Sequence, residues 1–314
     1  MLRYHIISYM VTVASVFVWA AGGPYLSPLK KCVRLFFFLT VMQVGAFQID
    51  FEISSGHQAA VHFAEHSESG KKYAAKLYPA KGSKGNGDYI GEVNALRHLS
   101  GCSGVVKMEA FFTFEDKGII ILEQMPFDLM HLIEHNMLTL EQRLNIFYKV
   151  CVAVKECHKR NVVHLDIKPE NILISSNFKR AKLCDFGNAQ ILTPDSREVW
   201  IKGGTIHYSA PEIFQQEKCD GKKVDIWSLG ILYHVLISLH WPYSGTDIRT
   251  LVKSGSLSIH TGLTKHQTKT FNKMTHINPA KRCTIKKLCY LTCTKHLQKY
   301  SHLQISKSQS SESF

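Results

Sequence analysis

Two acidic residues and one amide lie close together in the sequence, in a pattern that suits phosphoryl transfer. Asp166 precedes Asn171 by five residues, and Asp185 follows Asp166 by nineteen. An Asp side chain can accept or orient the proton of an attacking hydroxyl group. An Asn and an Asp offer oxygen ligands of the kind that Mg²⁺ takes together with phosphate oxygens and water. Lys168 adds a positive charge that can stabilise a phosphoryl group during transfer.

Seven segments resemble motifs of the eukaryotic-type protein kinase family, and they occur in the family's order. One such segment alone arises easily by chance, whereas seven with plausible spacing argue against chance. The match runs from about Phe47 to about His296. Lys168 resembles the Ser/Thr class, because tyrosine kinases usually lack a lysine at this position. The lean build is also similar to kinases encoded by large DNA viruses. The segments are Tyr73–Lys76, Gly91–Leu99, His164–Asn171, Asp185–Gly187, Gly204–Glu212, Asp225–Gly230 and Asn278–Arg282.

This resemblance implies a catalytic role for each matching charged residue. Asp166 is expected to be the base, and Lys168 is expected to contact the transferred phosphate. Asn171 and Asp185 are the expected ligands of Mg²⁺. Lys76 is expected to reach the α- and β-phosphates of ATP. The residues expected at the ATP site are Ile53, Ser54, Gly56, Val61, Ala74, Lys76, Glu92, Leu122, Glu123, Met125 and Asp128.

The resemblance also assigns finer roles around the nucleotide and in the scaffold. Glu92 should hold Lys76, Leu122 should stand behind the adenine, and backbone groups of Glu123 and Met125 should bond the adenine edge. Asp128 is a candidate ribose contact. Glu212 and Arg282 should form a buried ion pair, Asp225 should bond backbone amides of the catalytic loop, and Thr205 should contact the catalytic Asp. The residues expected to be structural are His164, Phe186, Thr205, Glu212, Asp225 and Arg282.

The chain departs from the family pattern at the phosphate-covering loop and next to the catalytic Asp. The family pattern has glycine at positions 54, 56 and 59, where this chain has Ser54, Gly56 and Ala59. We therefore expect activity with a weaker grip on the nucleotide. Leu165 stands where most of the family has an Arg that pairs with a phosphate on the activation segment. Activity should therefore not depend on a phosphate held there, although Thr193 and Ser196 remain candidates for modification.

Periodicity outside the motifs predicts an α+β, two-lobed fold. Residues 47–124 should form a small lobe with a five-stranded antiparallel sheet and one helix, and residues 125–300 a mainly helical large lobe. Strands are expected at 47–53, 59–64, 72–77, 105–114 and 118–123, and helices at 89–99, 140–159 and 225–239. The joint near Gln124 should leave a cleft, where ligand sites are favoured. The tail, residues 301–314, is expected to be disordered.

Residues 1–46 form a hydrophobic segment with an uncharged run at 6–21. We favour a membrane anchor that leaves the rest of the chain facing the cytoplasm, because Lys30, Lys31 and Arg34 follow the run. A cleaved signal peptide is a second interpretation. A segment that packs on the small lobe, or an over-extended reading frame, is a third. The net charge of +13 is interpreted as a solvated basic surface, and no nucleic-acid partner is expected, since the cations are dispersed.

Three functions remain open at this level. The first is a Ser/Thr protein kinase that transfers the γ-phosphoryl group of ATP, with Mg²⁺, to Ser/Thr hydroxyls of protein substrates. The second is a pseudokinase that acts as a binding or scaffold module, motivated by the poor glycine loop and the missing Arg. The third is a small-molecule phosphotransferase, against which Ala210-Pro211-Glu212 and residues 225–227 argue. The first is favoured because every charged residue that the chemistry uses is present.

Overall fold

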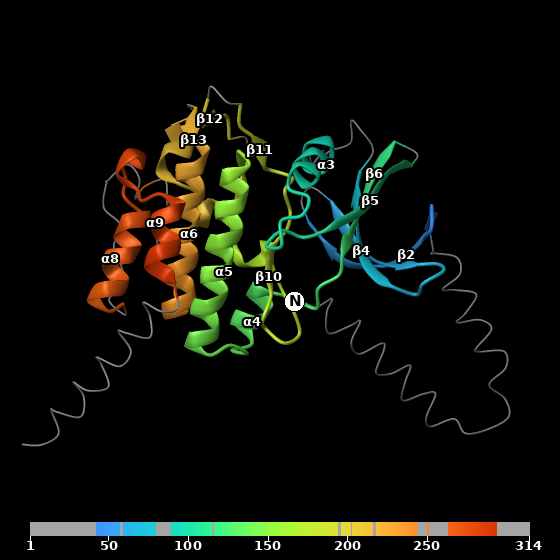
Figure 1. The fold of residues 1–314 in the computed structure, drawn as a ribbon, viewed down its shortest axis with the longest axis horizontal. Helices are drawn as coiled ribbons and strands as arrows, with labels where there is room; N and C mark the ends of the chain where they lie inside the picture. The colour runs from blue at the N-terminus through green and yellow to red at the C-terminus, as the bar shows by residue number, and fades with distance from the viewer. Residues whose placement is uncertain are drawn as a thin grey trace, which may run out of the picture.

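The computed structural model describes residues 42–56, 59–79, 89–114, 116–193, 196–201, 203–215, 218–243, 250 and 263–293. These residues form a strand-rich small lobe and a mainly helical large lobe that lie side by side (Figure 1), as the α+β, two-lobed prediction required. The run at 6–21 and the tail at 301–314 lie outside the described residues. Within those that are described, no helix combines the length and the apolar character needed to cross a bilayer.

The small lobe is built on a six-stranded antiparallel sheet with the order β1-β2-β3-β4-β6-β5. Five of these strands match the predicted ones, and the prediction of five strands missed β1. This strand lies inside the segment assigned to the hydrophobic N-terminus, and its three residues are too few for a recognisable alternation. Gly45, at φ +56°, makes the tight turn into β2. The strands are β1 (Met42–Val44), β2 (Phe47–Ser55), β3 (Ala60–His66), β4 (Lys72–Tyr78), β5 (Met108–Phe114) and β6 (Lys117–Glu123).

The curled sheet buries apolar side chains on both faces. Val44, Phe47 and Ile49 of β1 and β2 pack with Ala75 and Ile121 in a small cluster of their own. The opposite face carries the cleft and α3 (Tyr89–His98), the one helix described in this lobe. That helix turns Val93 and Leu96 inward, together with Glu92.

The strand predicted from residue 105 starts later, at Met108, because the preceding residues reach toward the other lobe. Val105 forms a β-bridge with Leu183, and the backbone N–H of Val106 donates to the carbonyl of Leu183 at 2.8 Å. These contacts tie the loop after α3 to the large lobe.

The large lobe is organised around two long helices, α5 (Leu140–Lys159) and α6 (Gly221–Ser238). The bounds of α5 match the prediction, because Thr139 and Gln142 form a capping box at its start. α6 begins four residues before the predicted start, since the Asp220 carboxylate caps the N–H groups of Lys222 and Lys223. It is buried over most of its length, as an apolar helix in a lobe centre must be.

The remaining large-lobe elements are shorter. Three helices complete the described set: α4 (Leu129–Glu134), α8 (Lys265–Met274) and α9 (Ile285–Thr292). A 3-10 turn, η4 (Pro279–Lys281), joins α8 to α9. The short strands are β7 (Phe127–Asp128), β8 (Val162–Val163), β9 (Ile172–Ile174), β10 (Ala181–Leu183), β11 (Gln190–Ile191), β12 (Glu198–Val199) and β13 (Cys219–Asp220).

Candidate active site

A cleft of about 1900 Å³ lies between the lobes and gathers the residues predicted for catalysis, metal and nucleotide. Glu92 is the exception and lies behind the wall of the cleft. The residues predicted to be structural, apart from Thr205, also lie outside the lining. The predicted residues that line the cleft are Ile53, Ser54, Gly56, Val61, Ala74, Lys76, Leu122, Glu123, Met125, Asp128, Asp166, Lys168, Asn171, Asp185 and Thr205.

The Asp166 carboxylate is held by three residues from two segments of the chain. Its Oδ1 accepts from the hydroxyl of Thr205 at 3.0 Å and from the Thr205 backbone N–H at 3.1 Å. Its Oδ2 accepts from Asn171 Nδ2 at 3.1 Å and lies 3.0 Å from Lys168 Nζ. Lys168 also donates to the Thr205 hydroxyl at 2.8 Å. The structure therefore contains the predicted contact between Thr205 and Asp166.

The catalytic loop is shaped by Asp225 at the start of the buried helix α6. Its Oδ2 accepts from the backbone N–H of His164 at 3.0 Å, and its Oδ1 from that of Leu165 at 2.8 Å. This confirms the predicted role of Asp225. These two bonds hold Leu165 in the left-handed region, at φ +66°, a conformation that residues other than glycine rarely adopt. His158 of α5 bonds the same carboxylate at 2.8 Å.

Lys76 sits between two carboxylates on the opposite wall of the cleft. Its Nζ lies 2.7 Å from Glu92 Oε2 and 2.7 Å from Asp185 Oδ1. Burial lowers the pKa of Lys76, but the charges of Glu92 and Asp185 outweigh burial and raise that pKa above its ordinary value. Burial raises the pKa of Glu92, which Lys76 opposes. Glu92 Oε1 also accepts from the backbone N–H of Phe186 at 3.1 Å, so one glutamate places both the lysine and the Asp185 turn.

The residues after β10 present Asp185 to the cleft. Phe186 is fully buried and packs against the His164 ring, with centroids 4.7 Å apart, and His164 Nε2 bonds the Cys184 carbonyl at 3.0 Å. Burial raises the pKa of Asp185, but the charge of Lys76 and its hydrogen bond outweigh burial and hold that pKa below its usual value. Asp185 is therefore an anion at neutral pH.

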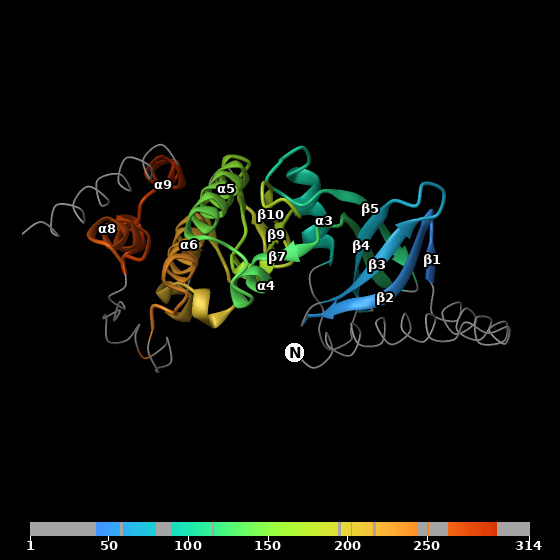
Figure 2. The same ribbon diagram turned by 90° about the horizontal axis from the view of Figure 1, so that it is seen from below.

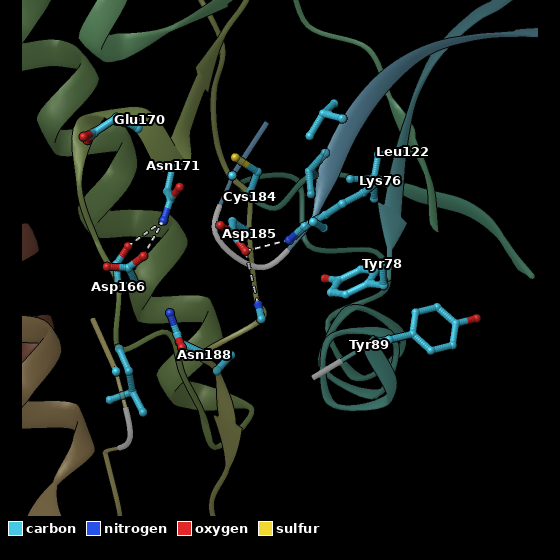
Figure 3. A pocket seen from close by; sticks show the side chains of 18 of the residues that line it. Lys76, Tyr78, Tyr89, Leu122, Asp166, Glu170, Asn171, Cys184, Asp185 and Asn188 are labelled. Carbon is cyan, nitrogen blue, oxygen red and sulfur yellow. Dashed lines mark hydrogen bonds and ion pairs between the residues drawn. The ribbon is translucent and has the colours of Figure 1, made fainter. Parts of the chain in front are cut away.

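Asn171 and Asp185 have the donor set that suits Mg²⁺. Both hydrogen bonds of Asn171 to Asp166 use the Nδ2 atom, so they do not engage its Oδ1 acceptor. Lys76 and the Gly187 N–H bond Oδ1 of Asp185 and do not engage Oδ2. Figure 3 shows Asp166 and Asn171 on one side of the cleft, Lys76 on the other, and Asp185 between them. One amide oxygen and one carboxylate beside a phosphate-sized space fit a hard divalent cation.

The hinge side of the cleft fits the predicted adenine contacts in part. Glu123, at the end of β6, uses its backbone N–H to bond the Lys107 carbonyl at 2.9 Å, so this N–H is already engaged within the protein. Its side chain pairs with Lys182 of β10. Asp128 lines the cleft, as expected of a ribose contact, but its Oδ1 caps α4 by accepting from the His131 N–H at 2.8 Å. The capping role was not predicted.

The described residues on the two sides of the phosphate-covering loop are joined by a backbone hydrogen bond at its one glycine. The Gly56 N–H donates to the Ala59 carbonyl at 3.0 Å. A Cβ at position 56 would lie only 3.3 Å from that same oxygen. Ser54 and Ser55 pair with Val61 and Ala60, so the small residues around Gly56 sit within the hairpin. A side chain at position 56 would therefore require a small shift of the Ala59 carbonyl.

The activation segment is joined to the large lobe by backbone bonds. β11 pairs with β8, β12 pairs with β13, and the Leu192 N–H donates to the Asn161 carbonyl at 2.7 Å. Leu165, in the position of the missing Arg, is buried at 4 % exposure. Thr193 and Ser196 are exposed. An apolar contact thus stands where the family has a phosphate-binding guanidinium group.

Glu212 and Arg282 form the predicted ion pair beneath the site. Arg282 Nη1 and Nη2 donate to Glu212 Oε1 and Oε2 at 2.6 and 2.7 Å, and the Arg282 side chain has no exposed surface. The guanidinium also lies over the Trp227 ring, 4.9 Å from its centroid. The pair fixes the end of the activation segment to the helical core.

Sequence reasoning also missed Lys182 and His158, which lie outside the cleft lining and hold Glu123 and Asp225 in place. Lys182 gave no signal, because a lysine on a short strand is ordinarily a solvated edge residue. His158 did give one: it falls four residues after Val154, on the apolar face of the predicted helix, and a histidine there implies a buried polar partner. Asp225 is that partner.

Comparison with known proteins agrees with this geometry. Residues 47–296 match the family model described as the protein kinase domain. Relatives include a probable serine/threonine-protein kinase of Dictyostelium discoideum, 28% identical over 265 residues, which cover 80% of this chain and 31% of the relative. Sucrose non-fermenting protein kinase 1 of Fusarium virguliforme is 27% identical over 270 residues, 82% of this chain and 37% of its own.

The similarity extends to animal proteins. Serine/threonine-protein kinase SIK1 of Mus musculus is 28% identical over 251 residues, which cover 78% of this chain and 32% of the relative. The chain therefore spans about a third of the length of these curated relatives. The family match covers far more than half of the sequence, and it coincides with the two lobes and their cleft. The chain belongs to the eukaryotic-type protein kinase family, and relatives named as serine/threonine-protein kinases are among those that it matches.

Proposed function

We propose that this chain is a catalytically active protein kinase that transfers the γ-phosphoryl group of ATP to Ser or Thr hydroxyls of protein substrates. The observation that carries the proposal is that Asp166, Lys168, Asn171, Lys76 and Asp185 all line one cleft. No charged residue that the reaction uses has been replaced. The name of one relative, a serine/threonine-protein kinase, supports the acceptor class.

In this proposal Asp166 orients and accepts the proton of the substrate hydroxyl. A carboxylate offers about four lone-pair sites. In the structure four donors use them: two from Thr205, one from Asn171 and one from Lys168. The Lys168 stem is rotatable, so its ammonium group can turn from Asp166 to a phosphate and leave room for the hydroxyl. Lys168 thereby couples phosphate arrival to exposure of the base.

The opposite wall binds the nucleotide phosphates. Lys76, held by Glu92, presents a fixed positive charge to them, which stabilises negative charge without later reorganisation. Asn171 and Asp185 would hold Mg²⁺, whose chemistry is to neutralise charge on the phosphate oxygens. The backbone carbonyl of Glu123 and the backbone of Met125 would bond the adenine edge. The turn at Gly56 would cover the phosphates.

The test is transfer of radiolabelled γ-phosphate to a mixture of Ser, Thr and Tyr peptides. Asp166→Asn should lower the rate by at least about 100-fold, because general-base groups contribute on the order of 10²–10⁴. The matched control is Glu141→Gln, a carboxylate-to-amide change at an exposed position in the first turn of α5 and outside the cleft lining, which should keep the wild-type rate. Wild-type activity in Asp166→Asn, or no transfer by the wild-type chain, would refute the proposal. Label on Tyr alone would refute the acceptor class.

A further inference from the structure

A second, smaller cavity of about 520 Å³ lies on the large lobe, against α8 and η4. Figure 2 shows α8 and α9 at the end of the large lobe that faces away from the small lobe. Four lysines line the cavity: Lys265, Lys269, Lys273 and Lys281. A histidine, His276, adds an imidazole to the four lysines, and the lining contains no acidic residue. We call these five residues the basic pocket.

The charge of the basic pocket is not neutralised within the described part of the chain. None of its four lysines has an ion pair there, whereas Lys107, Lys168 and Lys182 each have a carboxylate partner. Lysines four residues apart on one helix face repel one another and destabilise the helix. A concave surface that collects four such charges is suited to an anion with several charges.

The spacing of the lysines defines the shape of that anion. Lys265, Lys269 and Lys273 follow one another at four-residue intervals on α8, so the helical rise separates them by about 6 Å per step. Alternate residues of an extended chain are separated by about 6.6 Å. Phosphate groups on every second residue of an extended peptide would therefore meet successive lysines.

The chain itself contains this pattern. Ser306, Ser308 and Ser310 alternate in its last residues, which lie outside the described part. Three phosphoserines would carry a charge of about −4.5 to −6 at pH 7, which exceeds the single positive charge of Lys307 between them. Ser306 lies thirteen positions after Cys293, the last described residue, and a chain of that length can span about 40 Å. α9 rises only about 12 Å from its start beside η4, so the serines can reach the basic pocket.

We propose that the basic pocket binds the chain's own segment Ser306–Ser310 after its serines have been phosphorylated. The proposal rests on the proposed kinase activity for the source of the phosphates. The occupant is a phosphorylated peptide in extended conformation, with one phosphate at each lysine of the α8 row. Binding would fasten the end of the chain to the face of the large lobe that is remote from the cleft.

Binding can be measured without catalysis, which keeps this proposal separate from the proposed function. The probe is a fluorescent peptide of residues 303–314 with phosphoserine at 306, 308 and 310, titrated with full-length Asp166→Asn protein. We expect it to bind at least tenfold more tightly than the unphosphorylated peptide, and to weaken steeply as salt rises. A peptide of the same composition with its three phosphates on consecutive residues should bind at least threefold more weakly.

Matched variants locate the site. Lys265→Gln, Lys269→Gln and Lys273→Gln combined should weaken binding at least tenfold. The control is Lys286→Gln with Lys287→Gln, which removes two exposed charges from the neighbouring α9 without touching the pocket lining. Equal binding of phosphorylated and plain peptides, or equal losses in the two variants, would overturn the proposal. If the pocket bound inositol hexakisphosphate and also bound the two phosphopeptides equally, the proposal would be overturned, since the pocket would then be a general anion site.

Phosphosite mapping of the wild-type chain after incubation with Mg-ATP completes the test. We expect phosphate on at least two of Ser306, Ser308 and Ser310. Transfer to a test peptide with unmodified tail serines would overturn this inference and leave the proposed function intact. No transfer to any acceptor would refute the proposed function, while the peptide titration would still report on the basic pocket.

Discussion

Removal of Arg282 should destabilise the large lobe far more than removal of its partner Glu212. Arg282→Met strands the Glu212 carboxylate, of which only 12% is exposed. It also removes the guanidinium donors from the carbonyls of Lys223, His276 and Ile277, which they bond at 3.0, 2.8 and 3.2 Å. Breaking a buried ion pair from one side costs about 3–5 kcal/mol.

Glu212→Gln leaves most of the hydrogen bonds of Arg282 in place. The guanidinium keeps its three backbone acceptors, and the glutamine oxygen can accept one of the two lost bonds. The expected cost is therefore only that of a charged hydrogen bond, about 1.5–3 kcal/mol. The double variant carries no stranded carboxylate, so Glu212→Gln should restore about 1–3 kcal/mol to the Arg282→Met protein.

The assay is thermal and urea unfolding followed by tryptophan fluorescence, because Trp227 contacts the guanidinium directly. At about 2–4 °C per kcal/mol for a domain of this size, Arg282→Met should lower Tm by roughly 6–20 °C. Lys286→Met, an exposed cation on α9, serves as the control and should stay within about 0.5 kcal/mol of wild type. The reasoning fails if Glu212→Gln costs as much as Arg282→Met, or if it destabilises the Arg282→Met protein further.

Four further outcomes are expected. Lys76→Met removes the cation that opposes the raised pKa of Glu92, so Glu92 in the folded state holds its proton to higher pH. The loss of stability relative to wild type should therefore be smallest near pH 5 and grow toward pH 8. A pH-independent loss in denaturant titrations would contradict this. Thr193→Ala combined with Ser196→Ala should leave at least half of the kinase activity, because Leu165 cannot pair with a phosphate; a collapse of the rate would show that a phosphate is needed. The single-glycine loop should give a Kd for Mg-ATP of about 0.1–1 mM by calorimetry, near −5.5 to −4.1 kcal/mol, and the idea is wrong if no binding occurs at several millimolar. If residues 6–21 anchor the chain, full-length protein should stay with membranes in alkaline carbonate, and its release into the soluble fraction would count against the anchor.

The residues of the candidate site were predicted more completely from the sequence than the strands of the small-lobe sheet were. Asp166, Asn171 and Asp185 are close in sequence and carry chemistry that few other patterns share, so their types and spacing suffice. The strand β1 is three residues long, and its pairing with β2 depends on Gly45 and on side chains of distant strands. No local period records such contacts.

The residues around the hinge show the same limit. Val105 is a residue type that is common in strands, but its bridge to Leu183 depends on how the two lobes pack against each other. Asp128 was expected to face a ribose, and it lines the cleft, but its second role as the cap of α4 depends on where that helix begins. The pairing of Glu123 with Lys182 joins residues far apart in the chain, and nothing in either neighbourhood indicates the other.

The short strand ahead of Phe47 also matters for anyone who wishes to shorten this protein. A fragment cut where the family match begins would lack Met42 and Val44 and would open one side of the small apolar cluster around Phe47 and Ile49 to water. Such a fragment would expose an unpaired strand edge and an apolar surface to other copies of the protein, and both favour aggregation during expression. A shortened fragment should therefore retain Met42 and the residues that follow it.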